Sequence, residues 1–254
     1  MLFAKLYLHF QYNVIILMLA YARLAIVFHM LPILGERILA NLIVKNTVIF
    51  FVIIGLWPFV FTSPVPEQGW LIVLVKELIV GLILAVTLCL PFWIVIALGE
   101  LIDNQRGATI SDSLDPVHGV QGSILSGFFN FTFGAIFFAQ GGMRMLVEML
   151  AASYRVLPKG SELIEMNINE TGHFLLMLMQ SSIMLAAPVL IVMMLSEVLL
   201  GVFSRYCPQL NPFSLSLTIK SAIAFTIFMF YGFHSFTEKP LSLFSLQAFQ
   251  RFFI

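Results

Sequence analysis

The stretch LIVLVKELIVGLILAVTLCLPFWIVIALG, residues 71–99, decides the class of fold. Its only charged residues are Lys76 and Glu77. About 20 mostly apolar residues in helical form cross the hydrocarbon core of a bilayer, because a helix satisfies its own backbone hydrogen bonds. This stretch is longer than one straight span needs and it contains Pro91, which removes a backbone donor. We therefore expect a kinked membrane helix here.

Further apolar runs extend this pattern over the rest of the chain. They cover approximately residues 14–34, 42–61, 124–143, 173–203 and 213–235. The run 173–203 is again too long for a straight span, and Pro188 predicts a kink in it. Hydrophobic residues make up 60% of the chain and charged residues 10%, against about 25% charged in soluble domains. We predict an all-α, polytopic membrane-protein fold of about six kinked hydrophobic helices arranged in hairpins.

Two polar stretches interrupt the apolar pattern. The first, residues 100–122, reads ELIDNQRGATISDSLDPVHGVQG, and the second, residues 153–172, reads SYRVLPKGSELIEMNINETG. We interpret the second as a solvated connection and a boundary between two halves. The residue types of the first fit two alternatives. It is either a loop whose Gly, Ser and Asp residues end helices, or a polar element held where something is controlled.

Charges also occur within or beside the apolar runs. A charge at the bilayer centre costs a few kcal/mol, so such residues usually face protein or water. We expect Arg144 to pair with Glu148, four positions away on one helix. We expect Arg23, Glu197 and Lys220 to be left unpaired in a monomer and to require partner subunits.

Composition and motifs exclude several classes of function. A formal net charge of +0 gives no electrostatic footprint for nucleic acid. Cys89 and Cys207 stand alone, so we expect no disulfide and no metal site. The chain has no GxSxG or HExxH motif and no glycine-rich phosphate cradle. We therefore predict neither an enzyme nor a cofactor.

The two proline-containing runs resemble each other. PFWIVIALGEL begins at Pro91 and PVLIVMMLSEV at Pro188, and Glu100 and Glu197 each follow their proline by nine positions. The similarity is either a coincidence between two Leu-, Ile- and Val-rich helices or the trace of two related hairpins, which are common in membrane machines.

Two blocks of sequence resemble the FliR/SpaR/SctT family of type III export-apparatus proteins. One combines KELIVG, residues 76–81, with LPFWIVIALGELIDNQRGATISDSLDP, residues 90–116. The other is LSEVLLGVFSRYCPQLNPFSLSLTIK, residues 195–220. The runs IDNQRGAT and SRYCPQLNPFS are closer to the injectisome branch than to the flagellar branch.

The resemblance implies a structural subunit of the type III secretion export gate. Such a subunit lies in the bacterial inner membrane, within the basal body, and helps form and seal the pore that unfolded secreted proteins enter. It implies FliP/SctR-like, FliQ/SctS-like and FlhB/SctU-like partners. It also implies a FliP-like part, residues 1–152, and a FliQ-like part, residues 173–254, joined by the connection 153–172. The alternative is a secondary transporter or channel for a small solute, which also uses kinked helices with midplane charges.

The resemblance also suggests roles for individual residues. A pore plug, or gate loop, would include Asp103, Asn104, Gln105, Arg106, Gly107, Asp112, Asp115 and Pro116. Assembly or buried-charge contacts would involve Lys76, Glu77, Glu100, Glu197, Arg205, Pro208, Asn211 and Lys220. In the plug, local pairs between Arg106 and nearby aspartates would be weak and surface-like, worth about 0–1 kcal/mol each.

Overall fold

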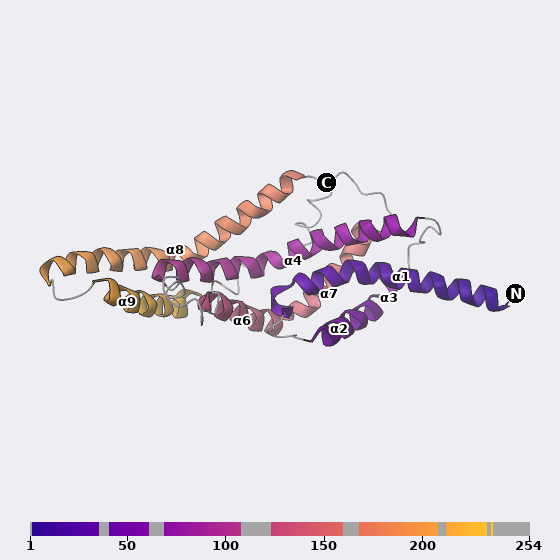
Figure 1. The fold of residues 1–254 in the computed structure, drawn as a ribbon, viewed down its shortest axis with the longest axis horizontal. Coiled ribbons are helices and arrows are strands. Elements are labelled where there is room, and N and C mark those ends of the chain that lie inside the picture. Colours follow the sequence, from indigo (N-terminus) through magenta and orange to yellow (C-terminus); the bar gives the residue numbers. More distant parts are fainter. Residues whose placement is uncertain are drawn as a thin grey trace, which may run out of the picture. The chain divides into compact units, whose positions relative to one another are not determined.

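The computed structural model describes residues 2–35, 41–60, 69–107, 123–159, 168–207, 212–232 and 235, and these are helical apart from short connections. Figure 1 shows the arrangement of the elements in the order of the chain. The elements are α1 (Leu2–Met30), the 3₁₀ turn η1 (Pro32–Leu34), α2 (Leu42–Gly55), α3 (Trp57–Val60), α4 (Trp70–Arg106), α6 (Ile124–Ala139), α7 (Gly142–Val156), α8 (Ile168–Tyr206), α9 (Pro212–Ile227) and the π-helical turn η2 (Phe228–Gly232).

The predicted all-α class with several long apolar helices is confirmed, but the count of six is not. Four helical stretches in the described part of the chain are long and apolar enough to cross a membrane. They are Lys5–Met30, Trp70–Arg106, Glu170–Tyr206 and Leu215–Gly232. The count rises to five if the interrupted pair α6 and α7 forms one span. Helix α2 has 14 residues and is too short to count.

The two longest helices, α4 and α8, each contain their predicted proline and continue through it. They differ in burial: 72% of the most apolar window of α4 is buried, against 22% of that of α8. Helix α4 is therefore a core element, whereas α8 packs through a narrow stripe. Figure 1 shows α8 changing direction along its course. Kinks caused by Pro91 and Pro188 stay predictions.

The helices group into two compact units that are not consecutive in the sequence. Unit 1 contains α1 to α3, α4 as far as Leu90, and α7. Unit 2 contains α4 from Pro91, α6, α8 from His173, α9 and η2. The boundary within α4 falls at its proline. The division into FliP-like and FliQ-like parts on either side of residues 153–172 stays a prediction.

A buried ion pair lies at the centre of unit 1. Arg23 on α1 is 1% exposed, and its Nε and Nη2 donate to the two carboxylate oxygens of Glu77 on α4, at 2.6 and 3.0 Å. Nη2 also donates to the Leu157 carbonyl at 3.0 Å, and the guanidinium lies 4.2 Å from the centre of the Tyr154 ring. The expectation that Arg23 lacks a partner in a monomer was wrong, because α4 supplies the carboxylate.

Aromatic side chains fill the interior of unit 2. Phe92 on α4 meets Phe133 and Phe137 of α6 edge-on, with ring centres 5.0 and 5.4 Å apart. Phe129 of α6 stacks on Phe228 of η2 at 4.1 Å. Edge-on and offset pairs of this kind are the favoured aromatic geometries. They hold α4, α6 and the end of α9 together around the region where α4 ends.

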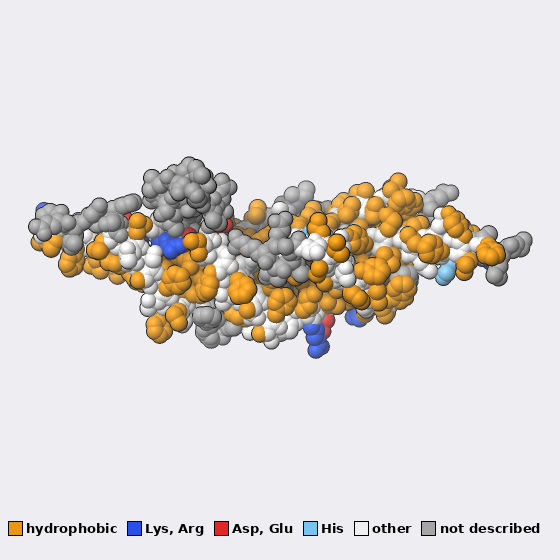
Figure 2. All heavy atoms as spheres, turned by 60° about the horizontal axis from the view of Figure 1, so that its bottom comes forward, with side chains coloured by type: hydrophobic (Ala, Val, Ile, Leu, Met, Phe, Trp, Pro, Cys, Tyr) orange, Lys and Arg blue, Asp and Glu red, His pale blue; other side chains and the backbone are white. Residues whose placement is uncertain are grey.

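Apolar side chains cover much of the described surface in the view of Figure 2. On α8 they include Leu175, Leu176, Met179, Ile183, Met184, Ile191, Met194, Leu195, Val198, Leu199, Val202 and Phe203. Monomeric soluble proteins rarely expose contiguous apolar patches larger than a few hundred square ångströms. The surface therefore fits a multi-pass membrane protein, as the helix lengths do.

Candidate functional site

The polar stretch that begins at Glu100 starts as helix, not as loop. Helix α4 runs on to Arg106, because Leu101 and Ile102 continue its apolar face and none of the next residues is a helix breaker. Gly107 ends the helix in the left-handed region, with φ 77°, and its amide donates to the Asn104 carbonyl at 3.1 Å. Our expectation of a loop from residue 100 was therefore wrong over its first seven residues, 100–106.

Asp103 connects the end of α4 to the start of α6. One carboxylate oxygen accepts from the Ser123 hydroxyl at 2.6 Å and from the Leu125 amide at 3.0 Å. The other accepts from Arg106 Nε at 2.7 Å. Ser123 in turn accepts from the Ser126 amide at 2.9 Å, as an N-cap residue does. A single carboxylate thus joins both sides of the segment between Gly107 and Ser123.

Helices α8 and α9 reach the same place. Lys220 on α9 donates to the Gln105 carbonyl at 3.3 Å and forms an ion pair with Glu197 on α8 at 2.9 Å. Arg106 Nη1 donates to the Ser221 hydroxyl at 3.4 Å. We call the whole group the loop-base cluster, and it consists of Asp103, Arg106, Ser123, Glu197, Lys220 and Ser221.

The charges in the loop-base cluster match the helix ends that they face. The Asp103 carboxylate lies at the N-terminus of α6, where free amides carry partial positive charge. The Lys220 ammonium lies at the C-terminus of α4, where free carbonyls carry partial negative charge. Each placement contributes about 0.3–1 kcal/mol when exposed and up to about 2 kcal/mol when partly buried. The cluster therefore stabilises the junction between the helices.

The pair between Asp103 and Arg106 is not the weak surface pair that we expected. The Asp103 side chain is 1% exposed and that of Arg106 is 15% exposed. Hydrogen bonds to a charged group contribute roughly 1.5–3 kcal/mol, and leaving such a group buried without partners costs more. The Asp103 contacts therefore form a firm connection, and any movement of the segment after Gly107 starts from a fixed base.

The other predicted site residues are distributed as follows. Glu77 lies in the interior of unit 1, Lys76 is half-buried beside it, and Glu100 and Arg205 are exposed. Asn104 is exposed and Gln105 is half-buried. Asp112, Asp115, Pro116, Pro208 and Asn211 lie outside the described residues.

Sequence reasoning missed three groups of the loop-base cluster: Ser123, the Leu125 amide and Ser221. Ser123 carries a usable signal, since a serine immediately before an apolar run is a typical helix start. It also missed that Glu197 has its partner within the chain. The side chain of Glu197 is 54% exposed even when paired, so the ion pair leaves much of the carboxylate free for other contacts.

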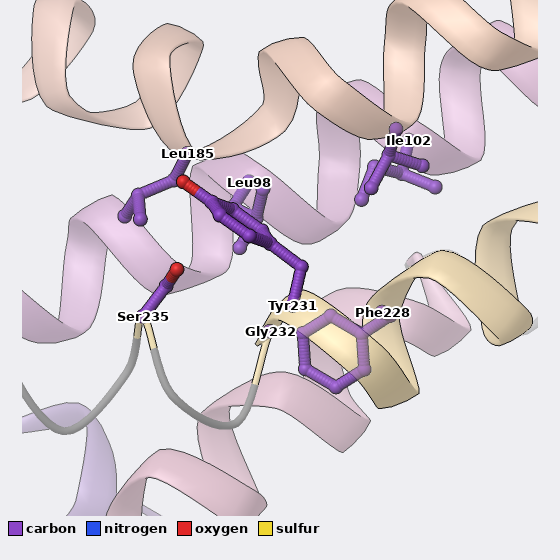
Figure 3. Close-up of a pocket in the computed structure, with 8 residues that line it drawn as sticks. Leu98, Ile102, Leu185, Phe228, Tyr231, Gly232 and Ser235 are labelled. Atoms are coloured by element: carbon purple, nitrogen blue, oxygen red, sulfur yellow. The ribbon is translucent and has the colours of Figure 1, made fainter.

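A small pocket in unit 2 shows what this region lacks. It lies between α4, α8 and η2, and Figure 3 shows that its lining is almost entirely aliphatic and aromatic. The hydroxyls of Tyr231 and Ser235 are the polar side-chain groups in that lining. Solute sites need several converging polar groups, so the pocket gives no support to the transporter alternative. No metal-ligand cluster occurs among the residues that the structure describes.

Comparisons with known proteins identify the family. The surface presentation of antigens protein SpaR of Shigella flexneri is 45% identical over 214 residues, which is 82% of this chain and 81% of that protein. SpaR of Salmonella typhimurium is 35% identical over 91% of this chain and 88% of its own length. The Yop proteins translocation protein T of Yersinia pestis is 31% identical over 80% of each chain. The family model of bacterial export proteins, family 1, matches residues 14–239, and the chain therefore belongs to that family, the one that includes the FliR and SpaR proteins.

Proposed function

We propose that this chain is a structural subunit of a type III secretion export gate and has no enzymatic activity. It helps form and seal the inner-membrane pore that unfolded secreted proteins enter. Its relatives support this, since one is named as a protein for the translocation of Yop proteins and others as proteins for the surface presentation of antigens. These names also favour the injectisome branch. FliP/SctR-like, FliQ/SctS-like and FlhB/SctU-like subunits are the proposed partners.

The observation that carries the proposal is the polar segment that starts from the loop-base cluster, between helices that are otherwise apolar. A pore wide enough for an unfolded chain would dissipate ion gradients unless something filled it at rest. The segment after Gly107, ATISDSLDPVHGVQG, offers small residues for close approach and polar groups that tolerate water when displaced. Residues 103–107, which we had included in the plug, form its helical base.

Deleting Gly107–Ser113 tests the sealing role. We expect the complex to assemble at parental yield and to let small ions or dyes leak across the membrane. Deleting the same number of residues from 160–167 is the matched control, since it shortens another polar connection in the sequence. If the deletion in the gate loop assembles and stays as tight as the parent, the segment is an ordinary loop and the sealing role is wrong.

The need for partner subunits has a basis different from the one that we first expected. The buried charges pair within the chain, so they do not require a partner. The exposed apolar side chains of α8 do need cover, from lipid or from other subunits. We expect the tagged chain to aggregate when expressed alone and to co-purify with a FliP/SctR-like subunit when the two are co-expressed. A stable, monodisperse monomer in mild detergent would contradict this expectation.

A further inference from the structure

We infer that Asp103 is the positioning residue of the gate loop, and that Arg106 and Lys220 connect the base of that loop to α8 and α9. The inference rests on the proposed function, because it concerns the mechanics of the same segment. The contacts that carry it all lie within unit 2 and involve described residues.

The first step is that Asp103 fixes both ends of the segment at one point. Its partners Ser123 and Leu125 are 20 and 22 positions further along the chain. The 15 residues 108–122 would span roughly 50 Å if fully extended, at about 3.3–3.6 Å per residue. With both ends held together, the segment must turn back, and its reach falls to roughly 25 Å, half of that span. Asp103 therefore limits how far the gate loop extends.

The second step is that the contacts of the loop-base cluster differ in strength. The three bonds to Asp103 measure 2.6–3.0 Å, and its side chain is almost fully buried. The contacts from α9, Arg106 to Ser221 and Lys220 to the Gln105 carbonyl, measure 3.4 and 3.3 Å. Hydrogen bonds weaken with distance, and those at the long end of the range give way first. A shift of α9 would therefore slide against α4 before it opened the connection between α4 and α6.

The third step concerns α8. Lys220 bridges two helices, since the same ammonium contacts the end of α4 and the Glu197 carboxylate of α8. Glu197 is largely exposed, so a neighbouring subunit or the passing chain has access to it. A new contact to Glu197 would compete for Lys220 and release it from the end of α4. The cluster thus provides a route by which a contact at the surface of α8 changes the support of the loop base.

The test uses the chain co-expressed with its partner subunits. Asp103→Asn keeps the shape of the side chain and removes its charge, whereas Asp103→Glu keeps the charge. Spin labels at Glu100→Cys and Phe128→Cys, two exposed sites on α4 and α6, report the distance between these helices. The exposed Cys207 is replaced by serine in all variants. Leak of small dyes across the membrane, complex yield and the thermal unfolding midpoint are measured on the same variants.

We expect Asp103→Asn to broaden the distance distribution and to leak as the Gly107–Ser113 deletion does, with the yield and the unfolding midpoint close to the parental values. Asp103→Glu should restore part of the seal, and Lys220→Met should give a smaller leak without broadening. A narrow distribution and a tight membrane in Asp103→Asn, alongside a leaking deletion, would overturn the inference and leave the proposed function intact.

Two further outcomes are also decisive. If the deletion does not leak, the proposed function fails, and the distances alone decide whether Asp103 holds the two helices together. If Asp103→Asn does not assemble, Ser123→Ala replaces it, since that variant removes one of three donors to the carboxylate. A broadened distribution in Ser123→Ala supports the inference, and an unchanged one overturns it.

Discussion

The charged cluster of unit 1 and the loop-base cluster of unit 2 use similar residues in different ways. In unit 1 the Arg23 guanidinium gathers a bidentate carboxylate, a carbonyl and an aromatic ring, and both charges of the pair are almost fully buried. In unit 2 the contacts are spread over four helices and grow longer and more exposed from Asp103 towards Glu197. A compact, buried pair keeps helices in one arrangement, whereas a graded series allows part of the structure to move.

The largest effect should follow from breaking the unit 1 pair. Glu77→Ala leaves the Arg23 guanidinium buried without its carboxylate, which costs about 3–5 kcal/mol in comparable cases. We expect a large drop in the thermal unfolding midpoint in mild detergent and in the yield of the purified protein.

The double variant Arg23→Met/Glu77→Leu is the matched control. Well-packed apolar residues often replace a buried ion pair at little cost, so most of the stability should return. A Glu77→Ala variant that unfolds with the parent would show that the pair does not hold α1 to α4.

The next largest effect concerns two glycines at which α4 meets its neighbours. A Cβ at Gly99 would lie 2.4 Å from Ser126 Cα in unit 2, and one at Gly81 would lie 2.6 Å from the Arg23 carbonyl in unit 1. Neither helix can yield a single atom, so alanine forces them apart at about 1–3 kcal/mol, the usual cost of overpacking. Gly201→Ala is the control, since nothing lies within 4 Å of its Cβ position. Equal midpoints for all three variants would contradict the close packing.

In the gate-loop region the same substitution has a second consequence. Gly99→Ala pushes α6 away from α4 just before Asp103, so it should also increase the leak through the assembled complex. Gly81→Ala lies in the other unit and should lower the unfolding midpoint without opening the membrane. Leak in both variants, or in neither, would remove this distinction between the two units.

A smaller effect concerns a third charge in unit 1. Burial lowers the pKa of Lys159 from 10.5 to about 8, and its ammonium donates to the Val60 carbonyl at the end of α3. Between pH 8 and 10.5 the unfolded chain binds more protons at this residue than the folded one, so this residue makes the free energy of unfolding rise with pH across that range. Lys159→Met should remove this part of the rise. Unfolding midpoints measured below pH 8 and near pH 10.5 in both proteins test it, and parallel pH profiles would contradict it.

Much of the helical pattern follows from the sequence alone, because long apolar runs that contain Pro91 and Pro188 need internal backbone hydrogen bonds wherever they lie. Helix α7 was missed, since it is amphipathic and a criterion based on long apolar runs does not detect it. The pairing of Arg23 with Glu77 was also missed. The two residues are 54 positions apart, and one sequence contains no information on which helix faces meet.

The candidate site was located but misjudged in strength. The composition of residues 100–122 pointed to the right place, and the structure then showed that Asp103 belongs to a helix and reaches across to α6. A polar composition does not distinguish an acid exposed in a loop from one that caps a distant helix, because the difference depends on where the second helix begins. The partners Ser123 and Leu125 follow 15 residues that the local pattern does not place.

The smallest effects should come from exposed pairs, and they calibrate the comparison. Arg144 and Glu148 lie four positions apart on α7, and the predicted pair forms, with Nε 2.7 Å from the carboxylate oxygen. Both side chains are mostly exposed to solvent, where water already stabilises the charges and ordering two long side chains offsets the attraction. Glu148→Ala should therefore leave the yield of the complex, the unfolding midpoint and the membrane seal as in the parent.

Glu197→Ala is the informative counterpart. Glu197 is about as exposed as Glu148, but its partner Lys220 is buried and also supports the end of α4. Its loss leaves a buried ammonium with less compensation, so the yield of the complex should fall and the leak should rise, though less than in Asp103→Asn. If Glu148→Ala and Glu197→Ala had equal effects, the exposed fraction of the carboxylate alone would decide its contribution. A larger effect at Glu197 would show that the helices connected by its partner decide it.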